Sequence, residues 1–154
     1  MPMLLKAKDK AALDGKGETK KLIAKLVMVC HEYIRMRDTP YGCRGVNSWG
    51  FCISCKKIIV FDGSDINASH FIPGDKRHWG TKFHEKNIHA SCVPCNAWME
   101  GNRVPYLKAL IKLYGAGIEN ELNLINALNP KKPDAFWLRE KIKYYQEKIK
   151  EISP

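Results

Sequence analysis

The sequence predicts an α+β fold, with a small central core of short strands and with helices on both sides of it. Apolar residues recur at helical spacing near the start of the chain and again over its last third. In the centre, two Cys-x-x-Cys pairs enclose short apolar runs that are bounded by turn residues. Because 154 residues suffice for one domain and hardly for two, we expect residues 18–154 to form a single domain.

The N-terminal flank is predicted to be one helix that follows a basic tail. Residues 1–17 are rich in Lys, Asp and Gly, and we expect them to be a flexible basic N-terminus. Between Thr19 and Arg37 the apolar residues lie three and four positions apart, which predicts a helix over residues 18–38. Residues 38–51 are rich in turn residues and are predicted to be a loop.

Residues 52–102 are predicted to form the core, and residues 103–154 a helical C-terminal half. In the core we expect strands over residues 58–61, 66–72 and 87–90, a long loop over 73–86, and a helix that opens at the second cysteine pair. The C-terminal half is predicted to hold helices over 106–114, 118–128 and 135–152, the last capped by Asp134. The apolar positions of this last helix support packing on the same domain and dimerisation equally: Leu138, Ile142, Tyr145, Ile149 and Ile152.

Four of the six cysteines predict a structural zinc site. Cys52 and Cys55 form one Cys-x-x-Cys pair, and Cys92 and Cys95 form the other, so four thiolates can close a tetrahedral zinc site. A redox-active pair is the competing interpretation, but that chemistry needs one pair and not two. No secretory leader is visible, so we expect reduced thiols and no disulfide framework. The remaining cysteines are expected in the helical core and, without an assigned role, in a loop: Cys30 and Cys43.

The charge balance favours a nucleic-acid partner. Lys and Arg number 26 against 16 Asp and Glu, which leaves a net charge of +10. The excess lies in residues 1–51 and 103–154, whereas the centre is nearly neutral. No apolar run approaches the roughly 20 residues that a membrane span needs. We therefore expect a cytoplasmic, DNA-associated protein with no membrane partner and no small-molecule cofactor.

The segment between the cysteine pairs carries residues that together predict a catalytic centre. His70 lies on a predicted strand, Asn87 opens the next strand, and Asn96 directly follows the last cysteine. Each residue alone is compatible with a purely structural role, but their order is typical of an HNH, or ββα-metal, nuclease with a treble-clef-like zinc core. His70 would be the general base that takes a proton from water, with His70 and Asn96 placed at a catalytic Mg²⁺ or Mn²⁺ ion. Asn87 would bond backbone groups across the hairpin and so orient His70.

Other polar residues near this centre are candidates for metal binding or DNA contact. Glu100, four residues after Asn96, would fall on the same helix face and is either a second metal ligand or a solvated side chain. His89 alternates with Asn87 and either contacts phosphate or fills the sheet. The candidate DNA contacts lie in the long loop, on the sheet and at the start of the C-terminal half: Lys76, Arg77, His78, His89 and Arg103.

A set of ordered motifs resembles the Rap/NinG family of bacteriophage recombination nucleases. The motifs span about half of the chain: Tyr33–Asp38 (YIRMRD), Cys52–Cys55 (CISC), Asn67–Phe71 (NASHF), Asn87–Asn96 (NIHASCVPCN), Gly101–Tyr106 (GNRVPY) and Leu113–Gly115 (LYG). The resemblance implies structure-selective cutting of branched DNA, namely Holliday junctions and D-loops, by a phage- or prophage-encoded protein in the bacterial host cell.

The cysteines followed at once by Asn96 also resemble the endonuclease VII type of junction resolvase. On that pattern His70 is the general base, Asn96 is a ligand of the catalytic metal, and the four paired cysteines hold zinc. The pattern has an Asp directly before the histidine, where this chain has Ser69. Serine is a poor Mg²⁺ ligand, so the ion is expected to have one protein contact fewer or to take Asp65 or Glu100 instead.

We therefore expect a metal-dependent endonuclease that acts on branched DNA. A homodimer is expected because two active sites related by a two-fold axis make paired cuts most simply. Two alternatives stay open. The first is a non-catalytic zinc module that binds DNA or a recombination protein, and the second is an HNH nuclease that cuts ordinary duplex DNA.

Overall fold

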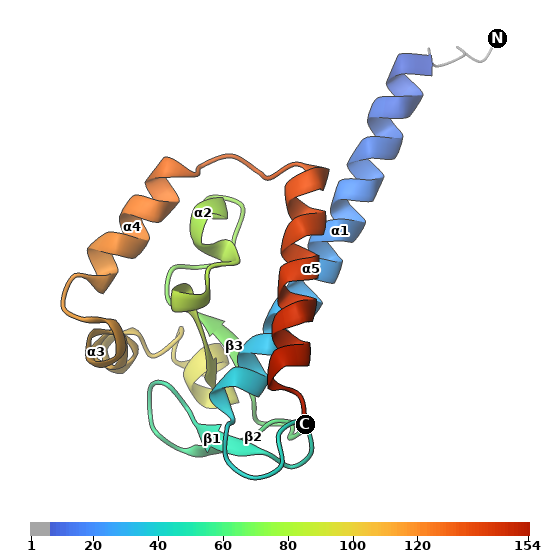
Figure 1. Cartoon of the computed structure of the whole chain (residues 1–154). Coiled ribbons are helices and arrows are strands. Elements are labelled where there is room, and N and C mark those ends of the chain that lie inside the picture. The colour runs from blue at the N-terminus through green and yellow to red at the C-terminus, as the bar shows by residue number, and fades with distance from the viewer. Residues whose placement is uncertain (1–6) are drawn as a thin grey trace.

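The computed structural model describes residues 7–154, with side chains described from Gly15 onward. A long N-terminal helix and the C-terminal helix lie side by side, and the shorter helices and two small sheets lie beside and below this pair (Figure 1). The elements in chain order are α1 (Ala7–Asp38), β1 (Trp49–Phe51), β2 (Ile58–Val60), β3 (Asn67–His70), α2 (Trp79–Lys82), the 3₁₀ turn η1 (Glu85–Asn87), β4 (Ile88–Ser91), the π-helical turn η2 (Pro94–Trp98), α3 (Arg103–Tyr114), α4 (Ile118–Leu128) and α5 (Ala135–Ile152). The predicted α+β class is confirmed.

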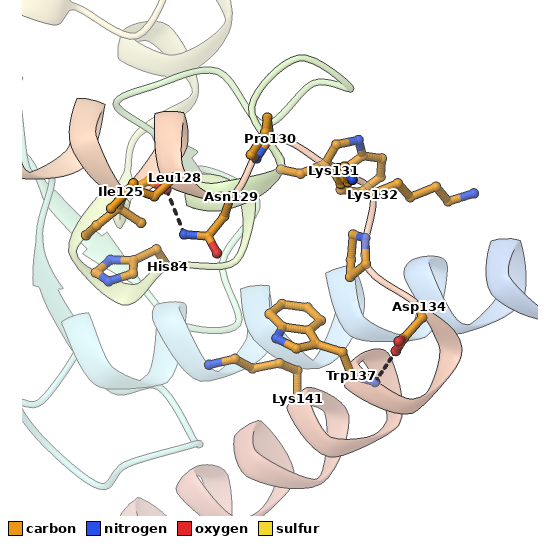
Figure 2. A pocket seen from close by; sticks show the side chains of 13 residues that line it. His84, Ile125, Leu128, Asn129, Pro130, Lys131, Lys132, Asp134, Trp137 and Lys141 are labelled. Carbon is orange, nitrogen blue, oxygen red and sulfur yellow. Dashed lines mark hydrogen bonds between the residues drawn. The ribbon is translucent and has the colours of Figure 1, made fainter.

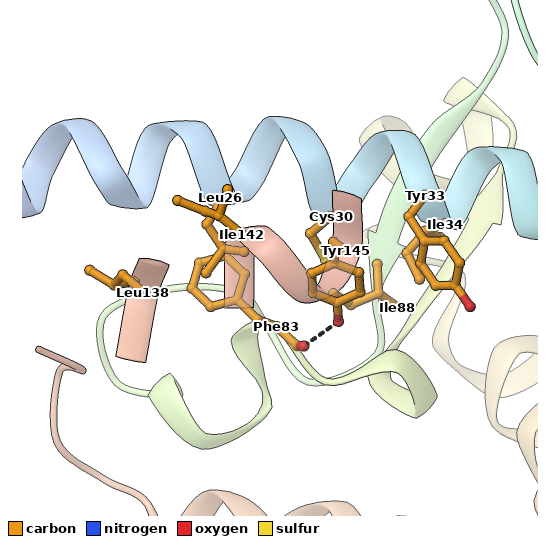
Figure 3. Packing of buried hydrophobic residues seen from close by; sticks show 9 residues of the cluster. All are labelled: Leu26, Cys30, Tyr33, Ile34, Phe83, Ile88, Leu138, Ile142 and Tyr145. Atoms are coloured by element: carbon orange, nitrogen blue, oxygen red, sulfur yellow. Dashed lines mark hydrogen bonds between the residues drawn. The ribbon is translucent and has the colours of Figure 1, made fainter. Parts of the chain in front are cut away.

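Helices α1 and α5 run parallel and form the main hydrophobic core. Arg139 near the start of α5 pairs with Glu18 of α1, and Ser153 just beyond its end contacts Met36. The buried side chains between them include the predicted core cysteine, Cys30 (Figure 3): Leu26, Cys30, Tyr33, Ile34, Phe83, Ile88, Leu138, Ile142 and Tyr145. Burial of this apolar surface is the chief stabilising contribution in such a core.

The apolar positions of α5 pack on the chain's own α1. Leu138 and Tyr145 are 0% exposed and Ile142 is 5% exposed, and the Tyr145 hydroxyl donates a hydrogen bond to the carbonyl of Phe83 (2.6 Å). The expected use of these positions as a dimer seam is therefore wrong. The other interpretation from the sequence, packing on the same domain, is confirmed.

Helix α1 begins at Ala7, which is earlier than the sequence predicts. Residues 7–17, expected as part of a flexible tail, are helical, and residues 1–6 lie outside the described part of the chain. Ala, Lys and Leu in this segment are strong helix formers, and each Gly lowers helix stability by only about 1 kcal/mol. The start of α1 extends beyond the start of α5 (Figure 1).

Strand β1 lies in a segment that the sequence predicts to be a loop. It pairs antiparallel with β2, with Phe51 opposite Ile58 and Trp49 opposite Val60. Gly50 lets β1 lie against the end of α1, because a Cβ at this position would lie 2.0 Å from the carbonyl oxygen of Asp38. This close approach of β1 to the end of α1 is a tertiary feature, so the core begins at residue 49 and not at residue 52.

The second sheet consists of β3 and β4, which pair antiparallel with His70 opposite Ile88 and Ser69 opposite His89. Strand β3 is shorter than the predicted strand over 66–72, and β4 begins one residue later than the predicted strand over 87–90. The predicted loop over residues 73–86 contains α2, whose Gly80 lies so close to α4 that a Cβ would be 2.6 Å from the carbonyl oxygen of Ile125. The predicted helix after the second cysteine pair is the single turn η2.

The C-terminal half follows its prediction closely. Helix α4 has the predicted bounds, and α3 begins three residues earlier than expected. Asp134 accepts a hydrogen bond from the backbone of Trp137 (2.8 Å), which confirms it as the N-cap of α5. Helices α3 and α4 cover a second core cluster: Ile53, Phe71, Ile72, Tyr106, Ala109, Leu110, Ile118 and Leu122. Within residues 7–154, every helix is too short or too polar to cross a membrane.

Candidate functional site

The four paired cysteines meet in a small cluster with side chains of β2 and β4. Their Sγ atoms all lie within 4.8 Å of one another: Cys52, Cys55, Cys92 and Cys95. The Sγ atoms of Cys55 and Cys92 are 3.6 Å apart. A tetrahedral zinc ion with Zn–S bonds of about 2.3 Å places its sulfurs about 3.8 Å apart, so the spacing fits zinc.

Local turns hold both pairs in place. In the first turn, the Cys52 backbone N–H donates to the carbonyl of Lys57 (2.8 Å), and Lys56 takes a left-handed φ of 64° to reverse the chain. In the second, Asp65 accepts a hydrogen bond from the backbone of Val93 (2.8 Å). These turns hold the two thiols of each Cys-x-x-Cys pair so that all four sulfur atoms lie close together.

The chemistry of these thiols also fits a divalent cation. None of the four is in a disulfide, and burial raises the pKa of the Cys92 thiol to about 12 and that of Cys95 above its usual value. Buried thiolates are unfavourable without a counter-charge, and a bound cation supplies it and deprotonates them. The Asn102 side chain donates to the Sγ of Cys95 (3.3 Å), which suits a thiolate acceptor. The four cysteines are grouped closely enough to bind a metal such as zinc.

His70 at the end of β3 is held from several sides. Its Nε2 lies 2.8 Å from the backbone carbonyl oxygen of Lys82, so Nε2 carries a proton and Nδ1 of the neutral ring is the acceptor. Gly74 packs against the ring, since a Cβ there would be 2.8 Å from Nε2. The ring of His31 in α1 lies 5.6 Å away between centroids. Burial lowers the pKa of His70, which favours the neutral form.

Asn87 makes the kind of cross-hairpin bonds that the sequence analysis expects. Its Oδ1 accepts from the Ile72 backbone N–H (2.8 Å), and its Nδ2 donates to the carbonyls of Ile72 (2.9 Å) and Thr81 (3.1 Å). Ile72 follows His70 by two residues, and Thr81 precedes Lys82. Asn87, which is fully buried, therefore ties together the two segments that hold the imidazole.

Asn96 lies in η2 and is bonded to the residue before His70. The Ser69 hydroxyl donates to its Oδ1 (2.8 Å), and the Ser69 carbonyl accepts from the Tyr106 hydroxyl (2.8 Å). Ser69 is buried, whereas Asn96 is partly exposed. The structure thus brings Asn96 to the residue next to His70, although Asn96 lies 26 positions after His70 in the sequence.

The expectation that His89 contacts phosphate is wrong. The alternative, that its side chain fills the sheet, fits the structure. The side chain is 3% exposed. Its Nδ1 lies 3.2 Å from the Tyr106 hydroxyl and its Nε2 lies 2.9 Å from the Tyr114 hydroxyl. Because the Tyr106 proton goes to the Ser69 carbonyl, Nδ1 of His89 donates to Tyr106 and Nε2 accepts from Tyr114. Both ring nitrogens are used within the protein.

The two carboxylates expected to replace the missing Asp lie elsewhere. Glu100 does not share a helix face with Asn96, because η2 ends at Trp98 and Glu100 is an exposed residue with a left-handed φ of 48°. Asp65 uses one oxygen for Val93 and the other for an ion pair with Lys57. The Glu100 expectation is corrected because it requires a helix that continues from the second cysteine pair to Gly101, and the Asp65 expectation is corrected because both carboxylate oxygens already have partners.

The basic residues of the loop before α2 lie on the surface. Lys76 and Arg77 are exposed, and Asp75 accepts from both Arg77 (2.6 Å) and His78 (2.9 Å). Arg103, also exposed, donates to the carbonyl of Phe71 (2.9 Å), lies 4.1 Å from the centre of that ring, and pairs with Glu119. Arg103 thus lies against Phe71, the residue after His70, and already has intramolecular partners.

Three residues that hold this centre are not among the site residues that the sequence predicts: Gly74, Lys82 and Tyr106. Tyr106 lies within one of the motifs that carry the family resemblance, but a tyrosine at helical spacing also fits a core position. Lys82 contributes its backbone carbonyl, a group that every residue type has. No residue-type pattern in the sequence could have indicated it.

A sequence model of the family described as "Bacteriophage Lambda NinG protein" matches residues 5–154. The chain belongs to the NinG family. Protein ninG of Salmonella phage P22 is 33% identical over 75 residues, which are 46% of this chain and 34% of that relative. The chain therefore matches about a third of the length of that NinG protein. No solved structure matches the chain.

The match confirms the predicted membership of the NinG family, which is a phage-encoded family. The family match spans the four paired cysteines and the centre around His70, Asn87 and Asn96. In this NinG chain, the geometry of the four grouped cysteines directly supports the predicted metal binding.

Proposed function

We propose that this NinG-family chain is a metal-dependent endonuclease of the HNH type that cuts branched DNA, such as Holliday junctions and D-loops. The observation that carries the proposal is the way His70 is held. A carbonyl fixes the proton on Nε2, so Nδ1 is the acceptor, and burial keeps the ring neutral near pH 7. A neutral imidazole with a fixed tautomer is suited to take a proton from an attacking water.

The chain's own residues supply positioning around this base. Asn87 ties the segment after His70 to the segment that bears the Lys82 carbonyl, which keeps the ring from turning. Asn96 offers a carboxamide oxygen next to Ser69, the residue that precedes His70, and this oxygen is the group that would hold Mg²⁺ or Mn²⁺. When bound, such an ion stabilises negative charge on the scissile phosphate and on the leaving oxygen.

Branched DNA is favoured as the substrate by charge and by family. A net charge of +10 suits a polyanion, and the exposed Lys76 and Arg77 lie in the loop that separates β3 from α2. Contacts of this kind reach phosphates and read the shape of the DNA, not its bases. The proposed preference for junctions and D-loops is based on the family resemblance alone.

The test is a cleavage assay on linear, forked and four-way DNA of one sequence, with and without Mg²⁺. His70→Ala should abolish cutting, while its zinc content and DNA affinity stay close to wild type. Asn96→Ala should weaken cutting and be partly rescued by higher Mg²⁺ or Mn²⁺, whereas Asn123→Ala, an exposed change on α4, should have no effect. Undiminished cutting by His70→Ala, or equal cutting of all three DNAs, would exclude this proposal.

One observation favours the alternative of a non-catalytic zinc module that binds DNA. Ser69 occupies one side of the Asn96 oxygen, and in the described part of the chain no carboxylate is hydrogen-bonded to Asn96 or His70. A Mg²⁺ ion would thus have few protein ligands. Such a module would bind junction DNA equally well with and without His70 and would cut none of the three substrates.

A further inference from the structure

A cavity of about 780 Å³, lined by neither the paired cysteines nor His70, lies between α2, α4, α5 and the linker over residues 129–134 (Figure 2). Its volume falls within the roughly 300–1,000 Å³ of typical ligand pockets. Trp79, Trp137 and Lys141 line it together with Lys131 and Lys132 of the linker. We call it the Trp137 pocket.

Aromatic side chains form part of the pocket wall. Trp137 is 38% exposed, and in Figure 2 its ring lies between His84 on one side and the linker on the other. The Nζ of Lys141 lies 5.7 Å from the centre of this ring. A partly exposed tryptophan beside a lysine offers a flat face for a planar group and a cation for an anion next to it.

The charge of the pocket is positive. Lys131, Lys132 and Lys141 line it, while Asp134 is its single carboxylate among the described residues. The Asp134 side chain already accepts the hydrogen bond that caps α5. Pro130 and Pro133 flank the lysine pair and restrict the backbone of the linker, and both lysines are exposed.

Flat aromatic faces and lysines together match a nucleic-acid strand whose bases are unpaired. In a duplex each base face is covered by its neighbours, so only unpaired bases can stack on a side chain within a pocket. The phosphates of such a strand would lie on the lysines at the rim. A branched DNA with a displaced strand or a flap supplies a strand of this kind.

Helix α2 links the pocket to the candidate catalytic centre. Trp79 and Gly80 line the pocket, and two residues further on the carbonyl of Lys82 accepts the hydrogen bond from His70. The same four-residue helix therefore contributes to both. A strand in the pocket would lie close to the segment that positions the general base.

We propose that the Trp137 pocket binds an unpaired DNA strand, with bases on Trp137 and phosphates on Lys131, Lys132 and Lys141. The inference rests on the proposed function for its biological setting, since it names the part of a branched substrate that this pocket takes. Binding itself does not depend on catalysis, so the two proposals can fail separately.

The test measures fluorescence anisotropy of a labelled dT12 oligonucleotide and of a 12-base-pair duplex, with the full chain and without added Mg²⁺. Wild type should bind dT12 more tightly than the duplex. Trp137→Ala should weaken dT12 binding about 10-fold, and Trp137→Phe should restore most of it. Phe136→Ala is the matched control, because Phe136 is 72% exposed on the same helix and does not line the pocket.

The lysines are tested by the salt dependence of dT12 binding. Replacing Lys131 and Lys132 together by Ala should lower the slope of log affinity against log salt by about 1.4, which is about 0.7 for each phosphate that is no longer neutralised. The matched control replaces the exposed Lys108 and Lys112 of α3 by Ala and should leave the slope nearly unchanged. Equal dT12 affinities of the Trp137→Ala and Phe136→Ala proteins would overturn the proposal. The same assay with labelled rU12 tests for RNA, and tighter binding of rU12 than of dT12 would also overturn it.

Discussion

At the residue scale, the ring of His70 depends on groups from separate segments of the chain. The Lys82 carbonyl fixes its tautomer, and Asn87 holds the segment that bears this carbonyl. Gly74 leaves the ring its space, because a Cβ at that position would lie 2.8 Å from Nε2 and 3.0 Å from two ring carbons. A methyl group added at position 74 would therefore change the position of the imidazole.

Gly74→Ala should displace the His70 ring and break its hydrogen bond to Lys82. We expect cutting of four-way DNA to fall at least about tenfold, which corresponds to about 1.4 kcal/mol of lost transition-state stabilisation. Zinc content and the urea midpoint should change little, because the clash falls on a side chain and not on the backbone. Gly17→Ala is the control, since nothing lies within 4 Å of a Cβ there. Wild-type cutting by Gly74→Ala would contradict the role of this contact.

His89 should make stability depend on pH. Burial lowers its pKa to about 4, whereas an unfolded histidine titrates near 6.5. Between these values the unfolded chain binds a proton that the folded chain does not, so the free energy of unfolding should fall as pH drops from about 6.5 to 4. At about 1.4 kcal/mol per unit of pKa, the contribution is about 3 kcal/mol at most.

The measurement is urea unfolding at pH 7.5 and pH 5, for wild type and for His89→Gln. Loss of a metal from the cysteine cluster in acid would destabilise both proteins equally, so the difference between their pH dependences isolates His89. The variant should lose less stability between the two pH values than wild type does. The same loss in both proteins would show that His89 is not the titrating group.

At the element scale, the cysteine cluster joins short strands that are weak structures by themselves. The strands β1, β2, β3 and β4 are three or four residues long and form two separate two-stranded sheets. Two-stranded sheets are marginal on their own in water. The cluster ties the turn after β1 to the turn after β4 and so fixes η2, which carries Asn96.

One zinc ion per chain is expected, and its removal should unfold the core. Structural zinc is worth roughly 10–16 kcal/mol in finger peptides, which is comparable with the roughly 5–15 kcal/mol stability of a whole domain. Cys92→Ser should therefore give aggregated or unfolded protein, while Cys43→Ser in the exposed loop should fold normally. The measurements are elemental analysis and circular dichroism. A well-folded wild type without zinc would contradict the prediction.

At the scale of the whole molecule, the parallel pair α1–α5 forms the scaffold against which β3 and β4 pack. Its interface uses the apolar positions of α5 that could otherwise have joined two chains. A homodimer that makes paired cuts is still our proposal, but its contact surface must differ from this seam. Light scattering of the protein, free and with junction DNA, tests the dimer directly.

Leu138→Asp should unfold the protein and not merely separate subunits. Leu138 is 0% exposed between α5 and α1, and an unpaired buried charge costs at least about 3 kcal/mol. Urea unfolding should show this loss, and the exposed change Gln146→Asp on the same helix serves as control. A folded, monomeric Leu138→Asp protein that nicks one strand of a junction would instead restore the seam as a dimer contact.

The sequence by itself determined the features that depend on local spacing. The cysteine pairs, the three C-terminal helices and the Asp134 cap follow from residue type at short separation, where periodicity and capping preferences are strong. The choice of His70, Asn87 and Asn96 as candidates likewise follows from their order along the chain. These features needed no knowledge of what packs against them.

Only the tertiary structure decided the features that depend on contacts between distant segments. Strand β1 lies against the end of α1, where only a glycine fits at position 50, and α5 faces α1 instead of a second chain. His89 is bonded to two tyrosines of α3 and not to phosphate. In each case one residue pattern is compatible with two environments, and the choice between them depends on long-range packing and hydrogen bonding that local spacing does not encode.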